Sequence, residues 1–178
     1  MRKLSILFLL FSFILHPNLF AIEYEYGKIT FEQTVKPKDL IYLGGGYAKD
    51  NFHIYYRGRE IKDASLTSFQ YLENGYGKDN WAVYFKGRKI NDISATSFMN
   101  LGNGYAKDNW KVLYNGEVLK EISSMSFTNL GWGYAKDNWK VIYNGQVIKN
   151  ASALSFENLG NGYAKDNWNT YYRGRKID

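Results

Sequence analysis

Residues 134–145 read Tyr-Ala-Lys-Asp-Asn-Trp-Lys-Val-Ile-Tyr-Asn-Gly, and this stretch recurs along the chain. Its first tyrosine returns every 29 residues, together with a lysine, an aspartate, an asparagine and an aromatic residue. The tyrosines are Tyr47, Tyr76, Tyr105, Tyr134 and Tyr163, and the aromatic positions are Phe52, Trp81, Trp110, Trp139 and Trp168. A fixed period of this length indicates a repeat architecture.

The middle of each repeat predicts a β-hairpin. Trp139, Val141 and Tyr143 alternate with polar or aliphatic residues, which favours a strand with these three side chains on one face. Asn144-Gly145 follows, and both residue types adopt the positive φ that a type I′ turn requires. Residues 146–149 then form the returning strand. A glycine holds the second turn position in every repeat: Gly58, Gly87, Gly116, Gly145 and Gly174.

A Ser-rich stretch closes each repeat, as in residues 151–160. Phe156 and Leu159 lie three positions apart, and Gly160 suits the left-handed end of a helix, so we expect one or two helical turns here. Residues 161–165 are expected to be extended and to lead into the next repeat.

The predicted fold is therefore mainly β, with stacked repeats that each contain a hairpin, an extended strand and a short helical turn. Four full repeats occupy residues 45–73, 74–102, 103–131 and 132–160. Residues 22–44 hold an N-terminal segment with a half-repeat, and residues 161–178 a truncated fifth repeat. The favoured arrangement is an open array. The alternative is a closed, propeller-like ring completed by the two terminal half-units.

Stacked repeats need a shared core, and the recurring large apolar residues are its candidates. The predicted core comprises Trp81, Trp110, Trp139, Trp168, Phe69, Phe98, Phe127, Phe156, Leu72, Leu101, Leu130 and Leu159.

The first 21 residues predict a secretory signal peptide. Arg2 and Lys3 precede an apolar run, residues 4–15, which is shorter than the about 20 residues that span a bilayer. Cleavage is expected after Ala21, and an uncleaved membrane anchor is the alternative. No later apolar run has membrane-spanning length. The protein is therefore expected to be exported, to a periplasmic, cell-surface or secreted location.

The composition argues against nucleic acid as a partner. Removing residues 1–21 leaves 21 Lys and Arg against 17 Asp and Glu, a net charge of +4 with both signs interspersed. Nucleic-acid binders concentrate basic residues in a stripe instead. The chain has no cysteine, so packing and hydrogen bonds alone must stabilise it.

Catalytic and cofactor chemistry finds little support. His53 is the one histidine after residue 21, and its strand position holds Ala82, Lys111, Lys140 and Asn169 in the other repeats. Nucleophilic triads and zinc sites depend on His or Cys. Glycosidases need two unlike carboxylates, whereas each repeat has the same aspartate in the same setting. We expect no enzyme activity, no cofactor and no metal.

The repeated aspartates, Asp50, Asp79, Asp108, Asp137 and Asp166, have two interpretations. They could bind calcium or a carbohydrate, and residues 74–79 approach a calcium-binding Gly-rich pattern. They could instead accept hydrogen bonds from backbone N–H groups in turns, which is the interpretation we favour.

Tyr, Trp and Phe make up 18% of the chain, which favours some exposed aromatic side chains. Such platforms bind sugar faces, quaternary amines or proteins. The candidates for binding are Tyr55, Tyr56, Tyr171 and Tyr172.

The motif Tyr-Ala-Lys-Asp-Asn-Trp-x-Val-x-Tyr-x-Gly, followed by Ser-Phe-x-x-Leu-Gly, resembles the repeats of the DKNYY family of bacterial exported proteins. The resemblance covers residues 36–178, and the paired tyrosines of the family survive as Tyr55-Tyr56 and Tyr171-Tyr172. Asp-Asn-Trp replaces the family's Asp-Lys-Asn and tyrosine pair. The resemblance implies an exported repeat domain and no particular activity.

The sequence as a whole favours a non-catalytic binding or scaffolding module at the cell envelope, with an unidentified protein or envelope glycan as partner. Glycan binding through surface aromatics is the first alternative, and an enzyme of unknown type ranks last.

Overall fold

The computed structural model describes residues 22–25, 28–31 and 40–177. The predicted signal peptide, residues 1–21, lies outside these ranges. The chain divides into two units, residues 1–40 and 41–178. In the first, β1 (Ile22–Glu25) pairs antiparallel with β2 (Lys28–Phe31). No helix in the described ranges is long and apolar enough to cross a membrane.

The second unit consists of five four-stranded antiparallel sheets, each formed by consecutive strands. The first sheet contains β3 (Ile41–Gly44), β4 (Tyr47–Lys49), β5 (Ile54–Tyr56) and β6 (Arg59–Glu60). The second contains β7 (Gln70–Tyr71), β8 (Tyr76–Lys78), β9 (Val83–Phe85) and β10 (Arg88–Ile90). The third contains β11 (Met99–Gly102), β12 (Tyr105–Lys107), β13 (Val112–Tyr114) and β14 (Glu117–Leu119). The fourth contains β15 (Thr128–Gly131), β16 (Tyr134–Lys136), β17 (Val141–Tyr143) and β18 (Gln146–Val147). The fifth contains β19 (Glu157–Gly160), β20 (Tyr163–Lys165), β21 (Thr170–Tyr172) and β22 (Arg175–Lys176).

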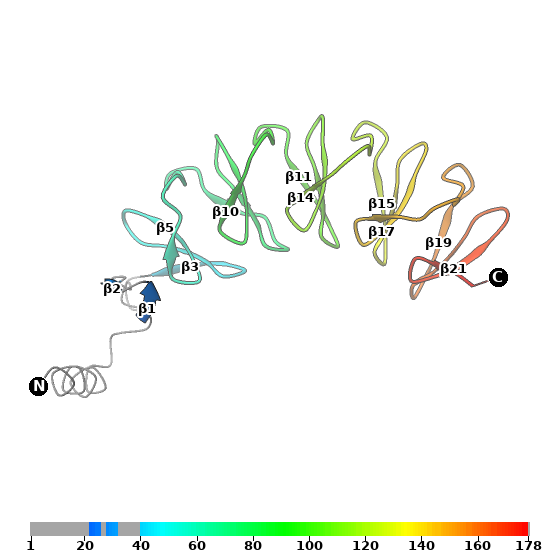
Figure 1. The fold of residues 1–178 in the computed structure, drawn as a ribbon. Helices are drawn as coiled ribbons and strands as arrows, with labels where there is room; N and C mark the ends of the chain where they lie inside the picture. The colour runs from blue at the N-terminus through cyan, green and yellow to red at the C-terminus, as the bar shows by residue number, and fades with distance from the viewer. Residues whose placement is uncertain (1–21, 26–27, 32–39, 178) are drawn as a thin grey trace, which may run out of the picture. The chain divides into compact units, whose positions relative to one another are not determined.

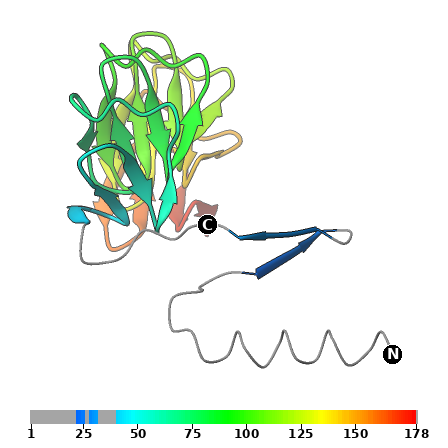
Figure 2. The ribbon, with the colours of Figure 1, turned by 90° about the vertical axis from the view of Figure 1, so that its left-hand side faces the viewer.

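The sheets follow one another in chain order along a curved row, from β3 at one end to β21 at the other (Figure 1). A view turned by 90° shows them one behind another (Figure 2). The all-β repeat fold and its open arrangement are thus confirmed. The ring alternative is wrong because the two half-units complete different sheets. Residues 41–44 supply the first strand of the first sheet, and residues 161–178 supply three strands of the fifth.

Two tight turns shape every sheet. The turn between the third and fourth strands has the predicted type I′ geometry, with φ values of 47° at Asn144 and 79° at Gly145. A second turn of the same kind joins the first and second strands, with φ values of 52° at Asn161 and 84° at Gly162. Type I′ turns match the twist of the strands that they join, so each sheet is a compact meander.

The predicted helical turn is only partly present. In the connection between the first and second sheets, the Phe69 N–H donates to the Ser65 carbonyl at 3.0 Å, which is one helical turn. No helix is present in residues 40–177. Residues 157–160, expected to end this turn, form β19 instead and pair with β20 through a bulge. The reason is the Asn161-Gly162 turn, which folds the chain back and gives these residues a strand partner.

Side chains from two successive sheets fix the segment that connects them. Between the third and fourth sheets, Lys107 Nζ donates to the Ser124 carbonyl at 2.9 Å, and the Ser123 N–H donates to Asp137 Oδ2 at 2.8 Å. In the repeated Lys-Asp pair, the lysine therefore binds the connection that follows its own sheet, and the aspartate binds the connection that precedes its own sheet. These bonds replace the hydrogen bonds that a helix would have made.

The core lies in the four junctions between sheets rather than on one face of each sheet. Val141 and Ile142 are neighbours in β17, yet both are fully buried. Val141 packs with Phe156 and the next sheet, whereas Ile142 packs with Phe127 and the previous one. Because each inner sheet is covered on both sides, its strands do not show the half-buried alternation that the sequence predicts.

Most predicted Phe and Leu core residues lie in or against these junctions. Phe98, Phe127 and Phe156 are buried, and Phe69, Leu72, Leu101 and Leu130 pack against the clusters. Leu159 is exposed, because no further sheet in the described residues covers it.

Candidate functional site

Each sheet carries a tight turn between its second and third strands, organised by the repeated aspartate. Asp79 is only 1% exposed. Its Oδ1 accepts the N–H groups of Trp81 and Ala82, both at 2.7 Å. Its Oδ2 accepts the Ser65 N–H at 2.8 Å and the Tyr84 hydroxyl at 3.1 Å. Both oxygens are thus occupied by protein donors, as the turn interpretation of the aspartates predicts.

The surroundings of Asp79 and Asp166 lower the pKa of these two carboxyl groups. For Asp166, burial raises the pKa, but the Ser152 and Trp168 N–H groups and the Tyr171 hydroxyl outweigh burial and lower it to about 2. Burial also raises the pKa of Asp79, but hydrogen bonds from the Ser65, Trp81 and Ala82 N–H groups outweigh burial and lower it. Asp79 and Asp166 therefore stay ionised and hold their turns over a wide pH range.

The aromatic residue after each Asp-Asn pair projects from this turn into solvent. The exposed fractions are 76% for Phe52, 82% for Trp81, 70% for Trp110, 71% for Trp139 and 79% for Trp168. We call these five side chains the aromatic row. The prediction that the four tryptophans form the core is wrong. The strands begin two residues after each tryptophan, so the tryptophan belongs to the turn around the aspartate and not to the buried strand.

One backbone hydrogen bond recurs beneath every member of the row. The N–H group of each aromatic residue donates to Oδ1 of the aspartate two positions earlier, at 2.7–2.9 Å. Since the topology and this contact are the same in all five sheets, the five side chains occupy equivalent positions along the array. The array thereby presents one apolar side chain per sheet at a regular interval.

The tyrosines predicted to bind a ligand lie elsewhere. Tyr55 and Tyr171 are buried, and their hydroxyls donate to Asp50 and Asp166 at 2.8 and 2.9 Å. Tyr56 is half-buried against the second sheet, where a β-carbon on Gly87 would lie 2.5 Å from it. Tyr172 is half-buried and stacks on Tyr163 with ring centroids 4.6 Å apart. Tyr55 and Tyr171 are therefore not surface platforms.

His53 lies beside the first aspartate turn and is exposed. Its Nδ1 is 3.7 Å from Asp50 Oδ1 and 3.4 Å from the Tyr55 hydroxyl. No serine or threonine hydroxyl forms a hydrogen bond with this ring among the residues that the structure describes. The histidine is thus part of the turn.

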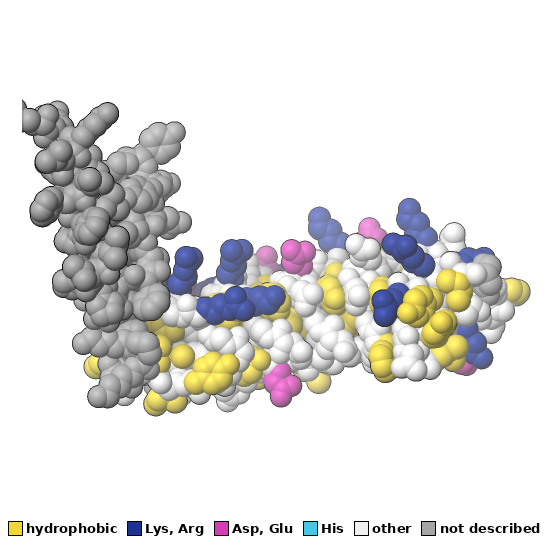
Figure 3. Space-filling view, turned by 90° about the horizontal axis from the view of Figure 1, so that it is seen from below, with side chains coloured by type: hydrophobic (Ala, Val, Ile, Leu, Met, Phe, Trp, Pro, Cys, Tyr) yellow, Lys and Arg dark blue, Asp and Glu magenta, His cyan; other side chains and the backbone are white. Residues whose placement is uncertain are grey.

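Charged side chains are unevenly distributed over the array. In one space-filling view, Lys and Arg side chains project from one side, and hydrophobic side chains form separate patches (Figure 3). The returning strands of the first, second and fifth sheets begin with Arg59, Arg88 and Arg175, whereas those of the third and fourth begin with Glu117 and Gln146.

A comparison with protein families matches residues 47–175 to the DKNYY family. The protein belongs to the DKNYY family. The matched region of this DKNYY chain begins with β4 and ends in β22, so it covers nearly all of the five sheets. No curated protein and no solved structure matches the chain.

Sequence reasoning missed two features of this DKNYY array. The first turn of each sheet carried a usable signal, since Asn-Gly pairs at residues 74–75, 103–104 and 161–162 are typical of hairpins. A ladder of asparagines was also missed. Asn129 Nδ2 donates to the Leu101 carbonyl at 2.8 Å, and Asn158 Nδ2 to the Leu130 carbonyl at 2.7 Å. These side chains join the first strands of successive sheets.

Proposed function

We propose that this protein is a non-catalytic binding module of the cell envelope that contacts its partner through the aromatic row. The observation that carries the proposal is the exposure of five equivalent large aromatic side chains, each 70% exposed or more. Large apolar groups in solvent forgo the stabilisation of burial, and their regular repetition on a rigid turn is typical of an interaction surface.

Equivalent sites along one chain favour a partner that is itself extended or repetitive. Each aromatic side chain alone offers a small contact area, but several contacts to one partner act together and raise the overall affinity. The repeated Asp hydrogen bond fixes the backbone of each turn before binding, which reduces the entropy lost on binding. An extended protein segment is the first candidate partner.

An envelope glycan is the second candidate, and the flat faces of the tryptophans favour it. The face of an indole ring carries partial negative charge and attracts the polarised C–H groups on the apolar face of a sugar ring. A polysaccharide also repeats along its length, as the row does.

The test is binding to isolated envelope material by a variant with Trp81, Trp110, Trp139 and Trp168 all replaced by alanine. The matched control replaces the exposed neighbours Asn80, Asn109, Asn138 and Asn167 with alanine in the same turns. We expect the tryptophan variant to lose binding and the asparagine variant to keep it. Equal binding by both variants would refute the role of the row. Pretreating the envelope with protease separates the candidates, because only a glycan partner survives it.

A further inference from the structure

Trp132 breaks the repeat symmetry of the array. It holds the first position of the turn between β15 and β16, where the other sheets have Gly45, Asn74, Asn103 and Asn161. Its φ is 54°, in the left-handed region that glycine and asparagine adopt readily and bulky residues adopt rarely. Other side chains with positive φ in this array are charged or polar, such as Arg57 and Lys86, so a large aromatic side chain in this conformation points to a role for that side chain.

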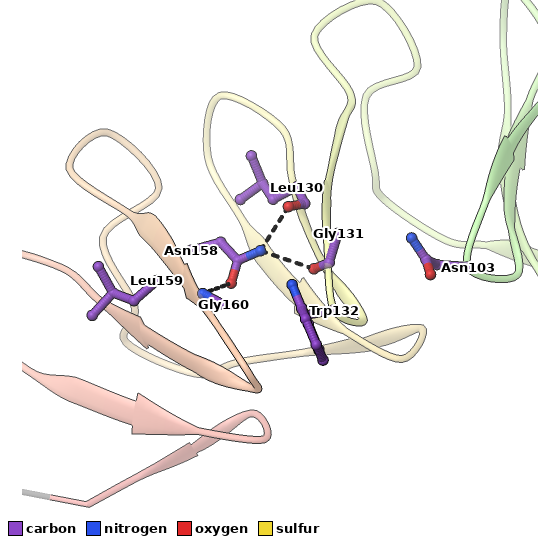
Figure 4. Close-up of a pocket in the computed structure, with 7 residues that line it drawn as sticks. All are labelled: Asn103, Leu130, Gly131, Trp132, Asn158, Leu159 and Gly160. Atoms are coloured by element: carbon purple, nitrogen blue, oxygen red, sulfur yellow. Dashed lines mark hydrogen bonds between the residues drawn. The ribbon is translucent and has the colours of Figure 1, made fainter.

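The Trp132 side chain borders a shallow hollow of about 670 Å³ that is lined by residues of the third, fourth and fifth sheets. Leu130, Gly131, Asn158, Leu159 and Gly160 line the hollow with Trp132, and Asn103 lies at its other side (Figure 4). Trp132 is 58% exposed, so its ring remains accessible.

The wall of the hollow is held rigidly. Asn158 Nδ2 donates to the Leu130 and Gly131 carbonyls at 2.7 and 3.2 Å, and its Oδ1 accepts the Gly160 N–H at 3.0 Å (Figure 4). A β-carbon on Gly160 would lie 3.8 Å from Trp132 Nε1, so the indole lies beside backbone that carries no side chain. Glycine at this position keeps the space next to the ring open.

The hollow also offers polar groups without protein partners. Within the described part of the chain, neither the Asn103 side chain nor the Trp132 indole N–H forms a hydrogen bond, and Asn103 is exposed. The indole N–H is a donor near Gly160, and the Asn103 amide supplies a donor and an acceptor at the other side of the hollow. None of the seven lining residues is charged.

We propose that this hollow binds one ring of a neutral saccharide. The apolar face of a sugar ring packs on an indole face, and its hydroxyls both donate and accept, as the free groups of Asn103 and Trp132 require. The shallow shape suits one ring of a chain that continues into solvent. A nucleotide fits less well, because no lining residue neutralises a phosphate. This site goes beyond the proposed function, since no member of the aromatic row lines it.

The test uses the protein with ¹⁵N-labelled tryptophan, whose indole N–H signals report Trp81, Trp110, Trp132, Trp139 and Trp168 separately. The probes are chitohexaose, cellohexaose and maltohexaose, with adenosine monophosphate as comparison. We expect at least one hexasaccharide to shift the Trp132 signal saturably. If no hexasaccharide shifts it, or if only the nucleotide does, the assignment is overturned.

The decisive variant is Trp132→Asn, which installs the residue present in three other sheets at φ values of 50–53°. It should fold with an equal or higher Tm, and its affinity for the active hexasaccharide should fall at least tenfold. Leu154→Ala is the control, because Leu154 is exposed and lies outside both the aromatic row and the hollow, and this variant should bind as the unaltered protein does. Unchanged affinity in Trp132→Asn would refute the proposal. The variant that lacks the four tryptophans of the aromatic row separates the two proposals. If it loses binding to the envelope but its Trp132 signal still shifts with the hexasaccharide, the row and the hollow bind independently.

Discussion

The Tyr105 hydroxyl accepts the Gly145 N–H at 3.1 Å and donates to the Gly133 carbonyl at 2.9 Å. One side chain of the third sheet thus bridges both type I′ turns of the fourth. Tyr47, Tyr76 and Tyr134 make the same pair of bonds to the sheet that follows each of them. This bridge explains why the tyrosine recurs without change every 29 residues.

Replacing Tyr105 with phenylalanine should therefore destabilise the array by about 1–3 kcal/mol, because a partly buried N–H and a partly buried carbonyl lose their partner. Tyr163→Phe is the matched control. The Tyr163 hydroxyl makes no hydrogen bond with the described residues, so this variant should stay within about 0.5 kcal/mol of the unaltered protein. Denaturant unfolding measures both, and equal losses would contradict the bridging role.

Gly145→Ala and Gly58→Ala separate backbone strain from packing. The φ values are 79° and 80°, so both alanines meet a similar left-handed penalty of about 1–2 kcal/mol. A β-carbon at Gly145 would lie 2.6 Å from the Tyr114 ring, whereas one at Gly58 meets no atom within 4 Å. We expect Gly145→Ala to lower the free energy of unfolding by about 1–3 kcal/mol more than Gly58→Ala does, because the added β-carbon overpacks the junction. Equal losses would mean that the junction repacks freely.

Trp139→Ala should change the free energy of unfolding by about 0.5 kcal/mol or less, since the side chain is exposed. Phe156→Ala should lose about 3–5 kcal/mol, because Phe156 is buried in the junction of the fourth and fifth sheets. Chemical denaturation of the two variants tests this difference. A loss for Trp139 as large as that for Phe156 would place the tryptophan in the core after all.

Acid should destabilise the fold. Burial raises the pKa of Asp166, but hydrogen bonds lower it to about 2 from an ordinary 3.8, so the ionised carboxylate favours the folded state. This contribution is complete above the unfolded pKa and is lost as the pH falls from about 4 to about 2. Tm measured against pH should fall across this window. In Asp166→Asn the fall should be smaller, and an unaltered pH profile would refute the contribution of Asp166.

Alkali should destabilise the fold by ionising the bridging tyrosines. Burial raises the pKa of Tyr47 and Tyr76 from 10.0 to about 12, although the backbone N–H bonds oppose it. Their stabilising effect is therefore complete below pH 10 and is lost as the pH rises toward 12. Absorbance of tyrosinate should rise together with unfolding, measured by circular dichroism. Ionisation of all tyrosines near pH 10 in the folded protein would contradict the burial of these two.

Local signals in the sequence predicted the Asn-Gly hairpin turn, the aspartate turn and most Phe and Leu core positions, but not the burial of both faces of the strands. Asn144-Gly145 and the repeated aspartate act within a few residues, so their roles follow from the chemistry of the turn itself. The burial of Val141 and Ile142 on opposite sides of one strand depends on two neighbouring sheets. A strand that is buried on both faces has no alternation of apolar and polar residues, so its sequence does not reveal this burial.

The candidate site shows the same division. The sequence located the repeated aromatic position at Trp81, Trp110, Trp139 and Trp168, but assigned those side chains to the core. Their exposure follows from where each strand begins, two residues later. The hollow at Trp132 needs residues from three sheets, Asn103, Trp132 and Asn158, and is therefore invisible in any single repeat.

The 29-residue period, the β-rich repeat and the turns at Asn144-Gly145 and Asp137 depend on residues close together in the chain, so they can be predicted from the sequence. The identity of the buried aromatic residues, the open array and the position of the hollow depend on tertiary contacts, because stacking covers both faces of each inner sheet. Burial of a side chain thus depends on sheets one repeat away.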